Sequence, residues 1–159
     1  MVVSIEVRGA EQMRVLGKEL RAAGIEGKGL RRELLAGMRV AAKPMAEAAK
    51  QAARDELPRA GGLNEWVAGS KFAVRNSLTG NGAGTRIVVR KPGGKKGAHD
   101  MAALDDGIAR HPVFGHRNVW KDTPIKAGWF SDTLQRDAPV AQAALLAAMQ
   151  TTIDALAKG

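Results

Sequence analysis

The side chains with the clearest capacity for chemistry lie in one short window that holds all three histidines of the chain and three aspartates. They are His99, Asp100, Asp105, Asp106, His111 and His116. Two imidazoles and a carboxylate can bind a divalent metal and activate a water molecule. The spacing matches no helix-borne histidine pair, and the window reads as loop. The favoured interpretation is therefore loop histidines that contact solvent or form hydrogen bonds, with no metal site.

Other catalytic arrangements find less support in the sequence. Ser70, Ser77 and Ser131 lack the Gly-x-Ser-x-Gly turn that exposes a nucleophile. The glycine-rich run at residues 80–84 matches neither a P-loop nor a dinucleotide fingerprint. The absence of cysteine excludes disulfides, thiolate nucleophiles and cysteine-ligated zinc. We expect no catalytic residue, no cofactor and no enzymatic activity.

The charge of the chain points to an anionic neighbour. Of the formal net charge of +9, residues 58–128 carry +7, from 12 basic and 5 acidic side chains. Within this segment, six cations are candidates for facing DNA and contacting its phosphate backbone without sequence specificity. They are Arg75, Arg86, Arg90, Lys91, Lys95 and Lys96. The competing interpretation is a solvated strand edge protected from aggregation by its cations.

Hydrophobic periodicity predicts the elements that position these residues. A short strand is expected at residues 2–7 and a first helix at 10–23. A long helix is expected at 28–57, either kinked near residues 41–44 by Pro44 or divided there into two abutting helices. A C-terminal helix follows, with Ser131 as its candidate N-cap.

Between the long helix and the C-terminal helix, residues 71–78 and 85–90 predict a β-hairpin with a long tip. Residues 99–128 predict an irregular excursion with one short strand at 119–125. Residues 1–159 are thus expected to form one α+β domain, in which a long kinked helix and the C-terminal helix pack on a small antiparallel sheet. The expected core is Leu30, Leu34, Met38, Met45, Leu134, Leu145, Met149 and Leu156.

The aromatic residues are few and unevenly placed. They make up 4% of the chain, and four of the six lie between residues 114 and 130, in predicted loop or at its junction with the last helix. Exposed aromatic side chains often contact partners. We therefore expect a subunit or partner interface, and expect Trp129→Ala or Phe114→Ala to impair assembly more than folding. The interface residues are Trp66, His111, Pro112, Val113, Phe114, Trp120, Trp129 and Phe130.

Several of these residues also carry a resemblance. The run Arg110-His111-Pro112-Val113-Phe114-Gly115, then Trp120, then Gly128-Trp129-Phe130 before a final helix, and Ala41-Ala42-Lys43-Pro44 in the long helix, resemble head–tail connector proteins of long-tailed bacteriophages. This is the tail-completion or minor tail family of the phage neck. The likeness extends over most of the chain. It departs at residues 58–66, where many members have Pro-x-Asp-Thr-Gly-x-Leu.

The resemblance implies a structural virion protein without catalytic residues. It implies a homo-oligomeric ring of six copies that joins the head-closure or adaptor protein to the tail tube or tail terminator protein. Double-stranded genomic DNA would pass through the lumen. No bilayer-spanning run of about 18 apolar residues is present and no signal peptide is evident, so the protein is expected to be made in the host cytoplasm and to have no membrane partner.

Two alternatives to the ring protein remain open. The first is a non-specific DNA-binding protein, which the basic middle segment favours. The second and weaker one is a metal-dependent hydrolase built on His99, Asp100, His111 and His116.

Overall fold

A computed structural model describes residues 2–5, 10–79, 83–90, 100–113 and 116–158. It confirms the predicted α+β class. The elements, in chain order, are β1 (Val2–Ile5), α1 (Ala10–Ala22), α2 (Gly24–Glu56), the 3-10 helix η1 (Ala60–Gly62), α3 (Leu63–Ala68), β2 (Lys71–Ser77), β3 (Gly84–Arg90), α4 (Met101–Asp105), β4 (Ile108–Val113), β5 (His116–Pro124) and α5 (Ser131–Lys158).

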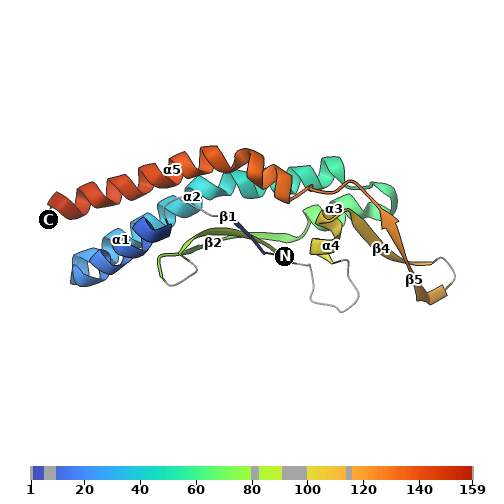
Figure 1. The fold of residues 1–159 in the computed structure, drawn as a ribbon, viewed down its shortest axis with the longest axis horizontal. Helices are drawn as coiled ribbons and strands as arrows, with labels where there is room; N and C mark the ends of the chain where they lie inside the picture. The colour runs from blue at the N-terminus through green and yellow to red at the C-terminus, as the bar shows by residue number, and fades with distance from the viewer. Residues whose placement is uncertain (1, 6–9, 80–82, 91–99, 114–115, 159) are drawn as a thin grey trace.

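Two long helices form the spine of an elongated molecule. The α5 helix lies along α2 and runs in the opposite direction, while α1 lies beside the first part of α2 (Figure 1). A sheet lies below this spine, and the β4–β5 hairpin lies at the end of the molecule away from the C-terminus (Figure 1). The spine thus carries the sheet along one side and the hairpin at one end.

The long helix α2 is continuous through Pro44, so its division into two helices is not seen. It begins at Gly24, four residues before the predicted start. Pro44 itself is exposed, whereas Ala42, Met45 and Ala46 of the same turns are buried. Proline has no N–H group, so the helix lacks one backbone hydrogen bond here. The packing of these buried neighbours holds the helix together across this gap. The helix ends at Glu56, and Leu57 is extended as expected for a residue before proline.

The core consists of two adjoining clusters. One lies among α1, α2 and α5, and the other lies between the second half of α2, the sheet and the start of α5. The predicted core is confirmed for Leu34, Met38, Met45, Leu134, Leu145 and Met149, which are buried. Leu30 and Leu156 are half-buried and pack against the first cluster.

The predicted hairpin at residues 71–78 and 85–90 is confirmed as strands β2 and β3, paired antiparallel from Lys71↔Arg90 to Ser77↔Gly84. Strand β1 pairs antiparallel with the other edge of β3, which makes a three-stranded sheet in the order β1-β3-β2. Phe72, Val74, Ile87 and Val89 lie on the sheet face that packs on the core. The side chains that alternate with these four lie on the opposite face of the sheet.

A second hairpin replaces most of the irregular excursion that was predicted for residues 99–128. Strand β5 (His116–Pro124) contains residues 119–124 of the strand predicted at 119–125 and begins three residues earlier, and β4 was missed. A proline in a sequence argues against a central strand, because it cannot donate a backbone hydrogen bond. In a two-stranded ribbon it is tolerated where its nitrogen points away from the partner strand. Pro112 lies opposite Trp120 in this position, next to a register shift at Pro112/Val113.

Asp105 connects the base of this hairpin to the start of α5. Its Oδ1 accepts hydrogen bonds from the backbone N–H groups of Phe130 and Ser131 at 2.8 and 3.2 Å. Its backbone carbonyl accepts one from Gly128 at 2.7 Å. The helix begins at Ser131 itself, so the acceptor that satisfies its first N–H groups comes from a residue 26 positions earlier. The sequence reading had assigned this role to Ser131.

We predict that Asp105→Ala lowers the free energy of unfolding by about 1–3 kcal/mol, because it leaves buried N–H groups without an acceptor. Asp106→Ala is the matched control, since Asp106 is exposed and should change stability by no more than about 0.5 kcal/mol. Urea unfolding of both variants measures the difference. Equal stability of the two variants would contradict this role of Asp105.

Candidate nucleic-acid interface

The outer face of the three-stranded sheet carries a group of cations from β2 and β3. Side chains alternate between the two faces of a strand, so the residues between the core-facing positions point outward. Lys71 lies opposite Arg90, and Arg75 lies opposite Arg86. These four residues are called the basic sheet face below. Its two cationic pairs are about 13 Å apart along the strands.

The basic sheet face has no carboxylate to balance it. No strand of this sheet contains Asp or Glu in its described range. Over the described part of the chain, the ion pairs involve none of these four cations. Like charges placed directly opposite each other on a sheet are destabilising. An anionic ligand spanning the two pairs would remove this cost.

A further arginine, from α2, joins the group at the edge of the sheet. Arg39 lines a shallow concavity together with Arg75, Asn76 and Arg86. The amide of Asn76 donates a hydrogen bond to the carbonyl of Leu35 at 3.1 Å, which fixes β2 against α2 one helical turn before Arg39. Three guanidinium groups from α2, β2 and β3 therefore border one surface depression. Guanidinium groups suit bidentate contact with phosphate oxygens.

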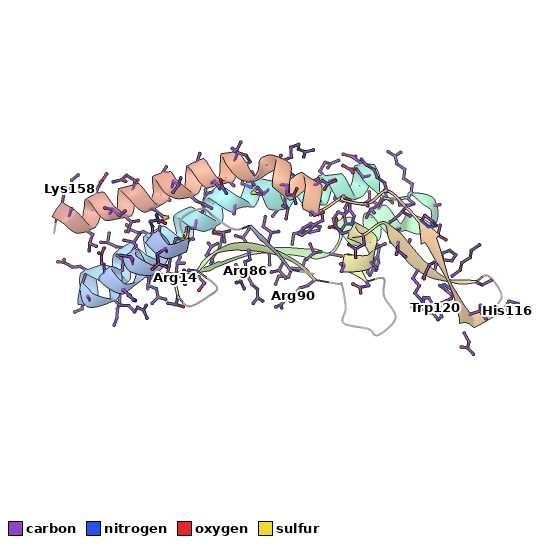
Figure 2. All side chains as sticks on the ribbon, viewed as in Figure 1. Arg14, Arg86, Arg90, His116, Trp120 and Lys158 are labelled. Atoms are coloured by element: carbon purple, nitrogen blue, oxygen red, sulfur yellow. The ribbon has the colours of Figure 1, made fainter. Side chains whose placement is uncertain are left out.

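Further basic side chains lie on the helices α2 and α1. On α2, a second depression is bordered by Lys28, Arg31, Arg32 and Arg39. On α1, Arg14, Lys18 and Arg21 border a third depression with Leu78 and Thr79, which follow β2; Glu11 also lines it and pairs with Arg14 at 2.7 Å. Figure 2 shows Arg14, Arg86 and Arg90 along the same side of the molecule, below the helical spine.

Among the six cations predicted to face DNA, Arg75, Arg86 and Arg90 lie together on this face. Lys91, Lys95 and Lys96 lie outside the described residues. Sequence reasoning missed Lys71 and Arg39. The alternation of strand 71–77 could have placed Lys71, because it has the parity of Arg75. Nothing in the sequence pairs Arg39 with this hairpin, because the contact depends on how β2 packs across α2.

The expectation that Trp129 and Phe130 form an interface is wrong. Both side chains are fully buried, with 0% of their surface exposed. Their ring centroids are 5.4 Å apart, and the rings of Trp129 and Phe72 meet edge to face at 6.5 Å. The Asp105 hydrogen bonds turn the chain at residue 130 into the core instead of leaving it as loop. These rings therefore serve folding.

The other predicted interface residues that the structure describes lie either at the boundary of the core or on the β4–β5 hairpin. Trp66, on α3, is half-buried against the core, and Phe114 lies outside the described residues. His111 is exposed, and its two ring nitrogens lie 2.9 Å from Thr123 Oγ1 and 3.2 Å from the Pro112 carbonyl oxygen. Pro112 and Trp120 are exposed, whereas Val113 is half-buried.

Among the histidines and aspartates of the same window that the structure describes, none are gathered into a metal site. Within the described ranges, no group of three His, Cys, Asp or Glu side chains could hold a metal ion. Asp100 instead caps α4 by accepting a hydrogen bond from the Ala102 N–H at 2.9 Å. His99 lies outside the described residues, so the proposed ligand set is not fully covered by the structure.

No protein-family model, no curated protein and no solved structure matches this chain. One described helix, α5, is long and apolar enough to cross a membrane by length and composition alone. One such helix is weak evidence for a membrane span. It buries Leu134, Leu145 and Met149 in the core clusters, but only 22% of its most apolar 18-residue stretch is buried. Functional inference therefore depends on the basic sheet face and on the sequence resemblance.

We predict opposite effects of Arg75→Gln on binding and on stability. The change removes one phosphate contact, so affinity for duplex DNA should fall and the slope of log K against log salt should decrease by about 0.9. It also removes repulsion from Arg86, so the free energy of unfolding should rise by a few tenths of a kcal/mol. Fluorescence anisotropy across a salt series, with urea unfolding, measures both.

Arg136→Gln is the matched control for charge, because Arg136 lies on α5 and pairs with Asp137. It should leave the salt slope unchanged. If Arg75→Gln and Arg136→Gln weaken DNA binding equally, net charge and not the basic sheet face is responsible.

The burial of Trp129 yields a second prediction. Trp129→Ala should lower the free energy of unfolding of the isolated chain by about 3–5 kcal/mol, because it empties a filled core position. Trp120→Ala, at a side chain 42% exposed, should cost much less. Thermal unfolding of the two variants makes the comparison. A small loss for Trp129→Ala would restore the interpretation that this ring contacts a partner.

Proposed function

We propose that this chain is a structural protein of the neck of a long-tailed bacteriophage. Copies form a ring between the head-closure or adaptor protein and the tail tube or tail terminator protein. Double-stranded genomic DNA passes through the lumen, and the basic sheet face points toward it. The protein is made in the host cytoplasm and functions in the virion. It performs no catalysis and contacts DNA without sequence specificity.

The observation that carries the proposal is the unpaired basic sheet face. Four cations lie on one face of two paired strands, and the described strands of this sheet hold no acidic residue. Such a surface follows a phosphate backbone and reads no bases, which suits a passage through which any genomic sequence must move. The six-residue run at 110–115 and the Gly-Trp-Phe before α5 support the placement in the phage neck.

The arrangement of the elements also suits a ring subunit. The basic sheet face occupies one long side of the molecule, so the helices α2 and α5 and the β4–β5 hairpin remain for contacts with other proteins (Figures 1 and 2). A ring subunit needs two different lateral surfaces in addition to the surface that lines the lumen. An elongated chain with a hairpin at one end offers such surfaces.

A non-specific DNA-binding protein that works without assembly is the second candidate, and the same basic sheet face favours it. The two candidates differ in what happens at physiological salt. A single subunit that contacts phosphates with the four cations of the basic sheet face, or with about seven if Lys91, Lys95 and Lys96 also take part, loses most of its affinity for DNA as salt rises. A closed ring encloses its DNA, so DNA whose two ends are blocked should stay in the lumen as salt rises, because its escape would require the ring to open.

We predict that a virus lacking this gene produces DNA-filled heads and complete tails that do not join. Supplying the wild-type chain in trans should restore joined particles, and antibody labelling should place it at the head–tail junction. Electron microscopy and mass spectrometry of purified particles make the measurement. Purified infectious particles that contain no copy of the chain would refute the proposal.

A further inference from the structure

The basic side chains in the first part of α2 share one side of that helix. Arg31, Arg32 and Arg39 follow Lys28 by three, four and eleven positions, which are the spacings of residues on one helix face. We call these four cations the α2 basic stripe. Over the described part of the chain, the ion pairs involve none of them.

The carboxylates of the same part of α2 point away from this stripe. Leu35 lies in the middle of the stripe and lines the same depression. Relative to Leu35, Glu26 and Glu33 project about 180° and 160° round the helix. Charge is therefore segregated on this helix, with cations on one side and carboxylates on the other.

The α2 basic stripe lies against the edge of the three-stranded sheet. The carbonyl of Leu35 accepts the hydrogen bond from Asn76, and Asn76 belongs to the edge strand β2. Arg39 borders both the depression along α2 and the depression that it shares with Arg75 and Arg86. The stripe and the basic sheet face therefore meet at Arg39.

The two groups of cations follow one another along the molecule. Leu78, just after β2, packs in the cluster that holds Leu34 from the first half of α2. Phe72, near the start of β2, packs against the cluster that holds Met45 from the second half. Strand β2 therefore runs opposite to α2, beneath it in Figure 1. The order along the helix is the stripe, then the Arg75–Arg86 pair, then the Lys71–Arg90 pair.

The length and the lining of this row of cations suit a DNA duplex. The stripe extends about 16 Å along α2, and the two pairs of the sheet add about 13 Å. A row of about 30 Å approaches one turn of B-DNA, which is about 34 Å. Neither of the two depressions that meet at Arg39 is lined by an aromatic side chain on which an unpaired base could stack, or by a carboxylate.

We propose that the α2 basic stripe and the basic sheet face form one track, along which each subunit contacts the phosphates of duplex DNA over about one helical turn. This inference rests on the proposed function and names the helix that joins the sheet in facing DNA. Charge complementarity carries it, because eight cations without a carboxylate partner lie in a row beside a polymer with one negative charge per about 1.7 Å. The side of α2 with Glu26 and Glu33 remains for contacts with other proteins.

The first test removes two cations of the stripe and leaves the sheet intact. Lys28 and Arg32 are both exposed, so the double variant Lys28→Gln/Arg32→Gln should fold, which thermal unfolding verifies. Fluorescence anisotropy with a duplex of about two turns, across a salt series, is the readout. The slope of log K against log salt should decrease by about 1.8.

Lys121→Gln/Arg136→Gln is the matched control. It removes the same charge from exposed positions on β5 and α5, outside the track, and should leave the slope unchanged. Equal changes of slope in the two double variants would assign the effect to net charge and overturn the inference. A wild-type slope in Lys28→Gln/Arg32→Gln would also overturn it, but would leave DNA contact by the basic sheet face standing if Arg75→Gln lowers the slope.

The second test locates the contact without a substitution. Exposed lysines of the full chain are acetylated with and without duplex at low salt, and mass spectrometry measures the extent of reaction at each position. Lys28 and Lys71 should be protected by DNA, whereas Lys121 should react equally in both samples. Protection of Lys71 without protection of Lys28 would confine the contact to the sheet and overturn the inference.

Other occupants of the stripe give different results. A single strand of equal length should bind more weakly than the duplex, and equally tight binding would overturn the inference. Vesicles of phosphatidylcholine and phosphatidylglycerol that bind the wild type but not Lys28→Gln/Arg32→Gln, with duplex binding unchanged, would assign the stripe to lipid and overturn it. No duplex binding by the wild type at about 50 mM salt would overturn it as well. That last result leaves the placement in the neck standing if purified particles contain the chain.

Discussion

The close packing of α5 along α2 is the constraint on which the rest of the structure depends. Small residues of α2, among them Ala42, Ala49 and Ala53, are fully buried. A Cβ atom added at Gly37 would lie 3.3 Å from the Cβ of Ala148, so the two helices approach closely. Because α5 and α2 lie together, the sheet can pack its apolar face on them and turn its cations outward. The same packing leaves one side of α5 uncovered.

The helices and the first hairpin could be predicted because their signals are local. The 4, 4, 3 spacing of Leu30, Leu34, Met38 and Ala41 indicates a helix, and the alternation after Lys71 indicates a strand. The burial of Trp129 could not be predicted, since it depends on hydrogen bonds from residues 130 and 131 to Asp105, 25 and 26 positions away. Strand β4 was missed because Pro112 breaks the usual strand signal.

In the candidate site too, features with a local sequence signal were predicted, and features that depend on contacts between distant residues were not. Arg75, Arg86 and Arg90 were predicted because they cluster in the basic middle segment, on the two strands of the expected hairpin. Arg39 was not, because its place beside them depends on the hydrogen bond from Asn76 to Leu35 across the sheet edge. The repulsion between Arg75 and Arg86 also has no sequence signal, since it requires the register of the hairpin. A polyanion spanning the two pairs would compensate this repulsion, whereas cations on the edge strand β2 would also protect it from pairing with another chain.

The central claim is that the basic sheet face points toward DNA inside a ring of this chain. An image of the neck of assembled particles, at a resolution that resolves strands, tests it most directly. The account predicts a closed ring of copies in which Lys71, Arg75, Arg86 and Arg90 line the lumen around the DNA. A neck ring in which this sheet face points away from the lumen would contradict it, as would a neck that does not contain the chain.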